Sequence, residues 1–357
     1  MLTTQEEKLY DRQLILPEIG EIGQLKLKNA RVLVIGAGGL GCSTLPYLVG
    51  AGIGNIGIVD HDTIDVSNLH RQLLYSFEDI GKNKAIIARN VLLKKNPYLT
   101  ITAYDYALTS QNATSIFAHY DIIVDGSDNF ATRYLINDTA IHCNKSVVFG
   151  SIFKFEGQVT VFNYKNGPSY RCLFPSPPPI HLSPSCAEIG VLGVLPGIIG
   201  SIQANEVIKI VCEIGTVLSG KLFVINCLTL QNYILNFQKT TNGLPHESDT
   251  FQELCSTSSI DHEISIVDFT QLNPATITVV DVRTPEERLE SAIDSLHFPL
   301  STLEADWNQI PTHLPIVFYC QSGVRSTLAL HFFITKNKAI KCYSLQGGLT
   351  RLLKTNA

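Results

Sequence analysis

An apolar strand that runs directly into a glycine-rich turn is the feature that most constrains this chain. The run from Arg31 to Ile35 continues into Gly36-Ala37-Gly38-Gly39-Leu40-Gly41, and a helix-like segment follows. Glycines at this spacing allow a tight turn and let a phosphate approach the backbone N–H groups at the start of a helix. Asp60 ends the next apolar run, where a carboxylate can hydrogen-bond a ribose hydroxyl. The pattern predicts an α/β fold that binds a nucleotide.

The segments around this turn predict the rest of the sheet. Short β-rich runs alternate with helix-length segments up to residue 150, which is typical of a Rossmann-like, doubly wound and mostly parallel sheet. The later segment 157–164 alternates apolar and polar residues, which predicts added antiparallel strands, and segment 221–234 is expected to form two further strands that close this unit. The parallel strands are expected at Val32 to Ile35, Ile56 to Val59, Ile101 to Tyr104, Ile122 to Val124 and Val147 to Gly150.

The chain has 357 residues, which exceeds the usual size of a single hydrophobic core. Residues 239–262 are polar and lack apolar periodicity, as expected for a linker. We therefore expect one domain over residues 1–238 and a smaller α/β domain over residues 263–357. Strands of the second domain are expected at Ile264 to Val267, Ile277 to Val282, Ile316 to Tyr319 and Lys341 to Ser344.

Composition excludes several classes of protein. With 45% hydrophobic and 17% charged residues the chain is globular, and a net charge of −5 gives no basic surface for nucleic acid. The first 20 residues hold no signal-peptide core, so we expect a cytoplasmic protein. The most apolar stretch, 189–202, is shorter than a membrane span and contains Pro196, so no membrane association is expected. No Cys-x-x-Cys pair occurs among the nine cysteines, which indicates reduced thiols.

Charged side chains follow the strands on either side of the glycine turn. Ser67, Asn68 and Arg71 come soon after Asp60, Lys84 sits in the next helix-like segment, and Asp128-Asn129 follow the strand at 122–124. Two cations and a carboxylate at the carboxyl edge of a sheet can hold a triphosphate with its Mg²⁺. The glycine turn alone would favour NAD or FAD, so an oxidoreductase stays the alternative.

These motifs, together with Arg12 in Tyr10-Asp11-Arg12-Gln13, resemble the MoeB/ThiF family over roughly residues 5–238. The resemblance implies that Arg12, Arg71 and Lys84 contact ATP phosphates, that Asp128 handles Mg²⁺ and that Asp60 holds the ribose. It also implies a homodimer in which Arg12 reaches the partner's site. The activity implied is adenylation of the C-terminal Gly-Gly of a ubiquitin-like carrier protein.

Two features of the cysteines bear on the family pattern: the zinc ligands and Cys186. Members often hold zinc on two Cys-x-x-Cys pairs, whereas this chain keeps only Cys172 of the first pair and neither cysteine of the second, so no zinc site is expected. Cys172 is then interpreted as a small apolar residue. Cys186 resembles the cysteine that, in fused members, attacks the adenylate or links to the carrier; a buried structural cysteine is the alternative.

A second cysteine loop follows the strand at 316–319. Cys320 begins Cys-Gln-Ser-Gly-Val-Arg-Ser, and a helix-like segment starts at Ser326. Loop N–H groups, the helix start and Arg325 would stabilise an anion on the sulfur, which makes Cys320 a candidate nucleophile and persulfide carrier.

This loop, with Asp281 and Arg283, resembles a single-domain rhodanese over roughly residues 263–357, although segment 289–298 lacks the usual Gly-His-Ile-x-Gly-Ala. The four residues between cysteine and arginine favour sulfur transfer over dephosphorylation. The fusion resembles MoeZ-type sulfurylases, so the Cys320 persulfide would attack the adenylated carrier, and Cys186 would release a thiocarboxylate. Thiosulfate or a cysteine desulfurase would supply the sulfur. A non-catalytic carrier-binding scaffold is a further alternative, and molybdopterin, thiamine, cysteine and tRNA thiolation are all compatible pathways.

Overall fold

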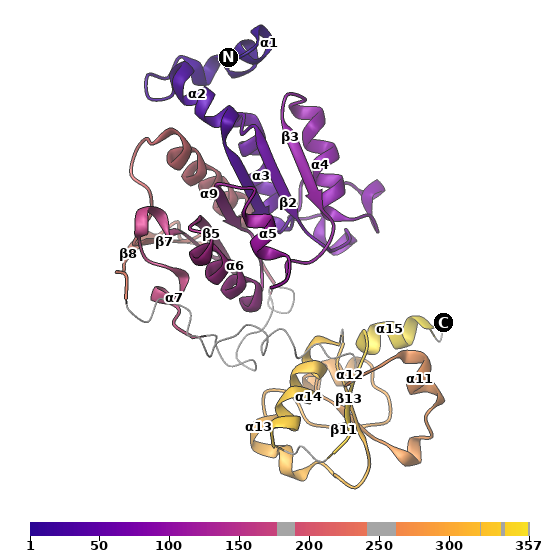
Figure 1. Ribbon diagram of the computed structural model, residues 1–357. Helices are drawn as coiled ribbons and strands as arrows, with labels where there is room; N and C mark the ends of the chain where they lie inside the picture. The colour runs from indigo at the N-terminus through magenta and orange to yellow at the C-terminus, as the bar shows by residue number, and fades with distance from the viewer. Residues whose placement is uncertain (177–189, 241–261, 322, 337–339, 356–357) are drawn as a thin grey trace. The chain divides into compact units, whose positions relative to one another are not determined.

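The computed structural model describes residues 1–176, 190–240, 262–321, 323–336 and 340–355. These residues form two compact units, the first containing the glycine turn and the second containing Cys320 (Figure 1). The boundary between them falls in residues 241–261, outside the described residues, so the expected linker at 239–262 stays a prediction.

The first unit is built on a mixed sheet in which the described strands follow the order β3-β2-β1-β4-β5-β6-β7-β8. The first five pair in parallel and the last three add antiparallel strands, as the sequence predicted. The strands are β1 (Arg31–Ile35), β2 (Asn55–Val59), β3 (Thr100–Tyr104), β4 (Ile122–Asp125), β5 (Ser146–Phe153), β6 (Glu156–Phe162), β7 (Lys221–Asn226) and β8 (Asn232–Asn236).

The strand order reverses between β1 and β4. In an open α/β sheet a ligand binds at such a switch point, beyond the carboxyl ends of the strands. Ile35 ends β1 and pairs with Asp125 at the end of β4, so the glycine turn and the Asp128 loop leave the sheet side by side.

Helices cover both faces of this sheet (Figure 1). Alternate side chains of each strand face opposite sides: Val32 and Val34 pack with α3, α4 and α9, whereas Leu33 and Ile35 pack with α5, α6 and α7. The apolar stretch around Pro196 leads into a helix whose buried residues include Leu195, Pro196 and Ile199. The helices are α1 (Thr4–Leu14), α2 (Gly20–Asn29), α3 (Gly39–Ala51), α4 (Lys84–Lys95), α5 (Ala113–Phe117), α6 (Phe130–His142), α7 (Tyr170–Leu173) and α9 (Leu195–Cys212).

The second unit has a parallel sheet of five described strands in the order β11-β10-β12-β13-β9. Its strands are β9 (Glu263–Ile264), β10 (Thr278–Asp281), β11 (Leu296–His297), β12 (Ile316–Tyr319) and β13 (Cys342–Leu345). Its helices are α11 (Ile266–Gln271), α12 (Pro285–Glu290), α13 (Leu303–Asp306), α14 (Val324–Lys336) and α15 (Gly348–Thr355).

The prediction of a strand at Ile264 to Val267 was wrong. Only its first residue belongs to β9, because Ser265 caps a helix by accepting a hydrogen bond from the backbone N–H of Asp268 at 3.1 Å. Because the Ser265 side chain caps this helix, the extended conformation ends at Ser265. The two-residue strand β11 was not predicted, since its pattern is too short to recognise.

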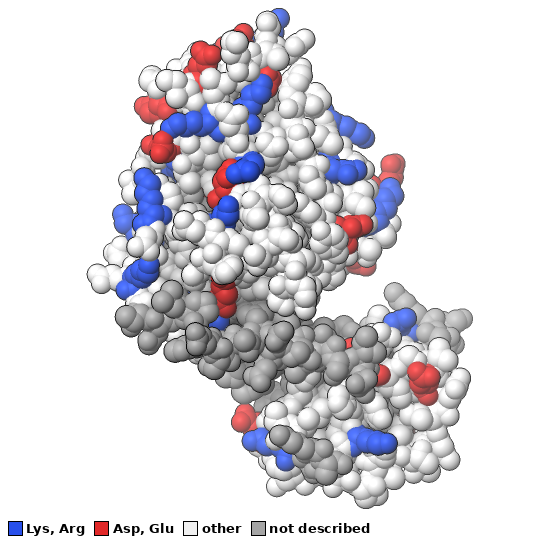
Figure 2. All heavy atoms as spheres, in the orientation of Figure 1, with Lys and Arg blue, Asp and Glu red and all other residues white. Residues whose placement is uncertain are grey.

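Basic and acidic side chains are interspersed on the face of the first unit that Figure 2 shows. Among the described residues, none of the helices is both long enough and apolar enough to cross a membrane.

Candidate functional site

The glycine turn is fixed by close backbone contacts. Gly36 has φ +94°, and a Cβ atom there would lie 2.6 Å from the carbonyl oxygen of Gly126. A Cβ atom on Gly41 would lie 2.0 Å from the carbonyl oxygen of Gly36, so this glycine lets α3 start directly behind the turn. Only glycine fits these positions. The turn therefore presents backbone rather than side chains to the space in front of α3.

A cavity of about 330 Å³ opens at the switch point of the sheet. It is bounded by the glycine turn, by the loops that follow β2, β3 and β4, and by Val191. The predicted site residues that line it are Gly36, Gly38, Gly39, Asp60, Asn68, Arg71, Lys84, Asp128 and Asn129. The structure thus brings together nine residues that the sequence spreads over 94 positions, from 36 to 129.

Asp60 supports the glycine turn from the end of β2. One of its carboxylate oxygens accepts a hydrogen bond from the N–H of Ala37 at 2.7 Å, and the other accepts one from the N–H of Asp62 at 2.9 Å. Burial raises the pKa of Asp60, although nearby Lys84 and these N–H donors oppose the rise. Asp60 therefore orients the turn in addition to facing the cavity.

The two predicted cations reach the cavity from different elements. Lys84 is the first residue of α4, is almost fully buried and forms an ion pair with Asp62 at 2.9 Å. Arg71 donates a hydrogen bond from Nη1 to the carbonyl oxygen of Ser67 at 2.8 Å. Asp62 was not identified from the sequence, since an exposed aspartate three residues beyond a strand has no distinctive pattern.

Arg133 is a third cation in the cavity wall and was also missed. It lies on the first turns of α6, is only 8% exposed, and is packed between the rings of Phe130 and Phe149. Its Nη2 donates to the carbonyl oxygen of Ser127 at 3.3 Å, and its buried Nε has no hydrogen-bond partner among the described residues. Burial raises the pKa of neighbouring Asp125, and the Arg133 charge opposes that rise.

Four predicted residues are not part of this cavity wall as the structure describes it. Gly41 lies behind the turn, and Ser67 is exposed with its hydroxyl donating to Asp65 at 2.7 Å. Arg12 lies on α1 with a side chain that is 90% exposed and that forms an ion pair with neighbouring Asp11 at 3.7 Å. Cys186 lies outside the described residues.

Cys172 is more polar than expected. Its Sγ accepts hydrogen bonds from the N–H groups of Ser169 and Thr240 at 3.3 and 3.4 Å. Burial alone would raise the pKa of this thiol, but the donors outweigh burial and lower the pKa. The interpretation as an apolar residue was therefore wrong. Among the described residues, Asp60, His61 and Asp62 form the one group of three potential metal ligands, and it contains no cysteine.

In the second unit, Cys320 follows β12 at the start of a closed loop. The residue is fully buried, and its Sγ accepts a hydrogen bond from the N–H of Gly323 at 3.2 Å. Ser326, also fully buried, has its hydroxyl 3.7 Å from the same sulfur. Gly323 has φ +97°, which turns its N–H inward. The Cys320 sulfur thus accepts one hydrogen bond from a backbone N–H and donates one to the Ser326 hydroxyl.

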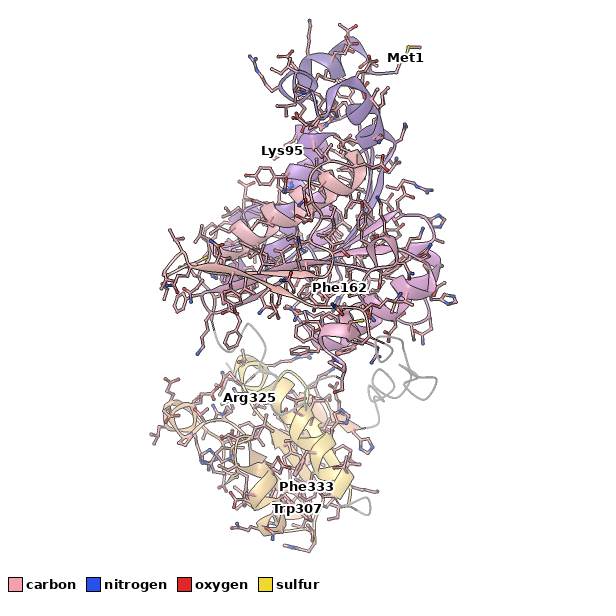
Figure 3. All side chains as sticks on the ribbon, turned by 90° about the vertical axis from the view of Figure 1, so that its left-hand side faces the viewer. Met1, Lys95, Phe162, Trp307, Arg325 and Phe333 are labelled. Carbon is pink, nitrogen blue, oxygen red and sulfur yellow. The ribbon has the colours of Figure 1, made fainter. Side chains whose placement is uncertain are left out.

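Arg325 was expected to act on the Cys320 sulfur, but its guanidinium is engaged by a carboxylate. Nη1 and Nη2 each donate to one oxygen of Glu287, at 2.7 and 2.6 Å. This hydrogen bonding lowers the pKa of Glu287 to about 2. Figure 3 shows Arg325 near one end of α14 and Phe333 further along, where its ring packs against Trp307.

Asp281 and Arg283 form a buried pair below this loop. Arg283 donates from Nε and Nη2 to the two oxygens of Asp281 at 3.0 and 2.8 Å, and from Nη2 to the carbonyl oxygen of Ser291 at 2.6 Å. Arg288 holds Ser295 through a bond of 2.7 Å to its carbonyl oxygen. The segment that lacks the usual glycines is therefore held in place by two arginines.

Comparison with known proteins agrees with both units. The sequence profile of the ThiF family matches residues 10–247, and that of the rhodanese-like domain matches residues 270–355. In the search of solved structures, the first unit is similar to the crystal structure of E. coli MccB with ATP, with a TM-score of 0.58 and 23% identity over 65% of this chain and 72% of that one. At that identity the likeness shows the fold alone.

Three relatives, each named for an enzymatic activity, match most of the chain. The probable adenylyltransferase/sulfurtransferase MoeZ of Mycobacterium tuberculosis is 38% identical over 99% of this chain and 94% of its own length. The sulfur carrier protein adenylyltransferase of Thermus thermophilus is 51% identical over 63% of this chain and 85% of its length. The MOCS3 adenylyltransferase and sulfurtransferase of Drosophila yakuba is 36% identical over 98% and 83%. The chain belongs to the ThiF family and joins a ThiF unit to a rhodanese-like unit.

Proposed function

We propose that this protein adenylates the C-terminal glycine of a ubiquitin-like sulfur-carrier protein and then transfers sulfur to it from a Cys320 persulfide, which forms a thiocarboxylate. The relatives combine the same two activities in their names. Family membership removes the support for a nicotinamide or flavin oxidoreductase, and the cations of the cavity and the closed Cys320 loop argue against a scaffold without catalysis.

Adenylation makes a poor electrophile reactive. A carboxylate oxygen of the carrier's Gly-Gly tail attacks the α-phosphorus of ATP, the bond to the β-phosphate oxygen breaks, and pyrophosphate leaves with the electron pair. Negative charge grows on the phosphates as this happens, and cations fixed before the reaction stabilise that charge. Arg71, Lys84 and Arg133 line the cavity where we place the triphosphate, and the N–H groups at the start of α3 face the same space.

Asp128 fits the role of a magnesium ligand. It lies in the cavity wall beside the N-cap residue of α6 and offers carboxylate oxygens, the ligand type that Mg²⁺ prefers. Asp60 and Asp62 already hold the glycine turn and Lys84. We therefore propose that Asp128 holds the Mg²⁺ that enters with ATP, where the ion would neutralise phosphate charge.

Sulfur transfer uses the second unit. The terminal sulfur of a Cys320 persulfide attacks the carbonyl carbon of the acyl-adenylate, and AMP leaves, so that the carrier is joined to Cys320 by an acyl disulfide. A thiolate then attacks the Cys320 sulfur of that bond and the carrier leaves as a thiocarboxylate. Cys186 stays our candidate for this thiolate. The N–H of Gly323, which donates a hydrogen bond to the Cys320 sulfur, would stabilise the persulfide anion before it reacts.

The observation that carries the proposal is that one chain holds both a cation-lined cavity and a buried cysteine. The sulfur of that cysteine accepts a hydrogen bond from a backbone N–H. The test is pyrophosphate exchange into ATP. We expect exchange only when a carrier with an intact Gly-Gly end is present, and thiocarboxylate on that carrier, seen by intact mass, only after thiosulfate or a desulfurase with cysteine is added. Exchange without a carrier, or a bound dinucleotide, would contradict the proposal.

We also propose that the protein is a homodimer in which Arg12 completes the partner's site. The exposed α1 segment carries Arg12 next to exposed Leu9, Ile15 and Leu16, an apolar surface that a second copy would cover. Arg12→Ala and Lys84→Met should each lose adenylation. A 1:1 mixture of the two, refolded or coexpressed, should regain about a quarter of wild-type activity, because half of the dimers then hold one intact site. No recovery would show that Arg12 acts within its own chain or not at all.

Two further expectations stay proposals. We place the domain boundary within residues 239–262, which limited proteolysis followed by mass measurement would locate. A cytoplasmic location agrees with the described free cysteines and would be tested by cell fractionation.

A further inference from the structure

Glu287 lies where it can control the charge at the sulfur site. It is on α12, and both of its oxygens accept hydrogen bonds from Arg325, the second residue of α14, which follows the Cys320 loop. The same carboxylate accepts a bond of 3.0 Å from the N–H of Thr284, which fixes its position at the start of the helix. Two parallel bonds between a guanidinium and a carboxylate form the most directional ion pair available to a protein.

This ion pair changes the electrostatic field that an incoming sulfur donor encounters. A single guanidinium beside the loop would attract an anion, but a carboxylate within 2.7 Å cancels most of that field at the distances where a donor approaches. The other arginine that holds the loop is compensated as well: Arg283 donates to Gln321 at 3.2 Å and is paired with Asp281.

The loop cannot easily move away from this arrangement. Its first two carbonyls, of Cys320 and Gln321, accept hydrogen bonds from Leu349 and Thr350 of α15 at 2.8 and 3.0 Å. The Gln321 side chain is bound to Arg283 on one side and donates to Thr350 on the other, at 3.0 Å. The charge that Arg325 presents is therefore set by Glu287 rather than by loop motion.

We propose that Glu287 is a positioning residue that determines donor specificity: by engaging Arg325 it disfavours sulfur donors with two negative charges, such as thiosulfate, relative to singly charged donors, such as a thiol persulfide. The inference rests on the proposed sulfur-carrying role of Cys320. It names the chemical class of donor, which the adenylation and transfer steps leave open.

The reaction concerned is sulfur uptake. The Cys320 thiolate attacks the outer sulfur of thiosulfate, the S–S bond breaks, and sulfite leaves with the electron pair, so that three negative charges are present before and after the step. Benzenethiosulfonate reacts in the same way and releases benzenesulfinate, but it brings one charge instead of two. The two donors therefore report on the charge at the site while the bond that breaks stays of the same kind.

The test compares Glu287→Gln with wild type for both donors, using the full chain. Glutamine keeps an acceptor oxygen for the N–H of Thr284, but it removes the charge and one of the two oxygens that accept from Arg325. We expect the KM for thiosulfate to fall roughly tenfold with little change in kcat, and the KM for benzenethiosulfonate to fall about threefold, since the field acts on half the charge. Glu286→Gln is the matched control: it removes the same charge from an exposed neighbour and should leave both values unchanged.

The effect must act through Arg325. In an Arg325→Met background, Glu287→Gln still removes a negative charge but frees no guanidinium, so the fall in the KM for thiosulfate should be smaller than in the wild-type background, which a double-mutant cycle would show. If Glu287→Gln leaves the ratio of the two KM values unchanged, the inference is overturned, although sulfur uptake itself would remain. A wild-type protein that takes sulfur from neither donor would instead overturn the sulfur-carrying role of Cys320.

Discussion

Replacing Cys320 with serine should abolish sulfur uptake and thiocarboxylate formation while leaving carrier-dependent pyrophosphate exchange at the wild-type rate. A serine hydroxyl cannot accept a sulfane sulfur, so we expect the loss to be roughly 10³-fold or more. Exchange should survive because the cavity that holds the cations belongs to the other unit. Intact mass after incubation with thiosulfate, together with an exchange assay on the same sample, measures both.

Cys342→Ala is the control for this experiment. Cys342 lies on β13, next to β12, and burial raises the pKa of its thiol to about 11, which makes it a poor nucleophile. Sulfur uptake should therefore continue in that variant. Labelling that persists in Cys320→Ser, or that disappears in Cys342→Ala without loss of folding, would show that another cysteine carries the sulfur.

Lys84→Met should lower carrier-dependent pyrophosphate exchange by ~10²–10³-fold, because it removes a fixed cation from the place where phosphate charge develops. Its partner Asp62 is exposed, so water can solvate the carboxylate that loses the ion pair, and the melting temperature should change little. Sulfur uptake on Cys320 from thiosulfate should stay as in wild type. Initial-rate exchange assays and thermal unfolding measure these effects.

Lys82→Met gives a matched comparison two residues away. Lys82 is exposed, pairs with Asp79 at 3.2 Å and does not line the cavity. Its loss should leave exchange within about twofold of wild type, as for an isolated surface charge. If both variants lose exchange equally, the net charge of the surface matters rather than the position of Lys84, and the proposed triphosphate site would be wrong.

Sequence patterns predicted most of the architecture because the central strands are short apolar runs with clear ends. The strand at Ile316 to Tyr319 was predicted to the residue, and the parallel strand pairs followed from the alternation of strand and helix. Prediction was wrong at Ile264 to Val267 because the residues are β-formers, yet Ser265 caps a helix there. Local propensity does not show which of two competing backbone hydrogen bonds forms.

The candidate site was predicted only in part for a related reason. Gly36, Asp60, Lys84 and Asp128 stand at strand ends or helix starts, positions that a pattern can locate. The partners that set their charge come from elsewhere: Glu287 is 38 residues before Arg325 in the chain. Nothing in the spacing of such pairs indicates contact, since packing of α12 against the cysteine loop brings them together. Charge compensation is thus the part of a site that requires the three-dimensional structure.

The complete burial of Cys320 has a consequence for how long a captured sulfur atom survives. A persulfide exposed to water is oxidised readily or lost to any passing thiol, whereas a sulfur without access to bulk solvent is protected from both reactions. A Cys320 persulfide would therefore persist between the arrival of a donor and the arrival of a carrier.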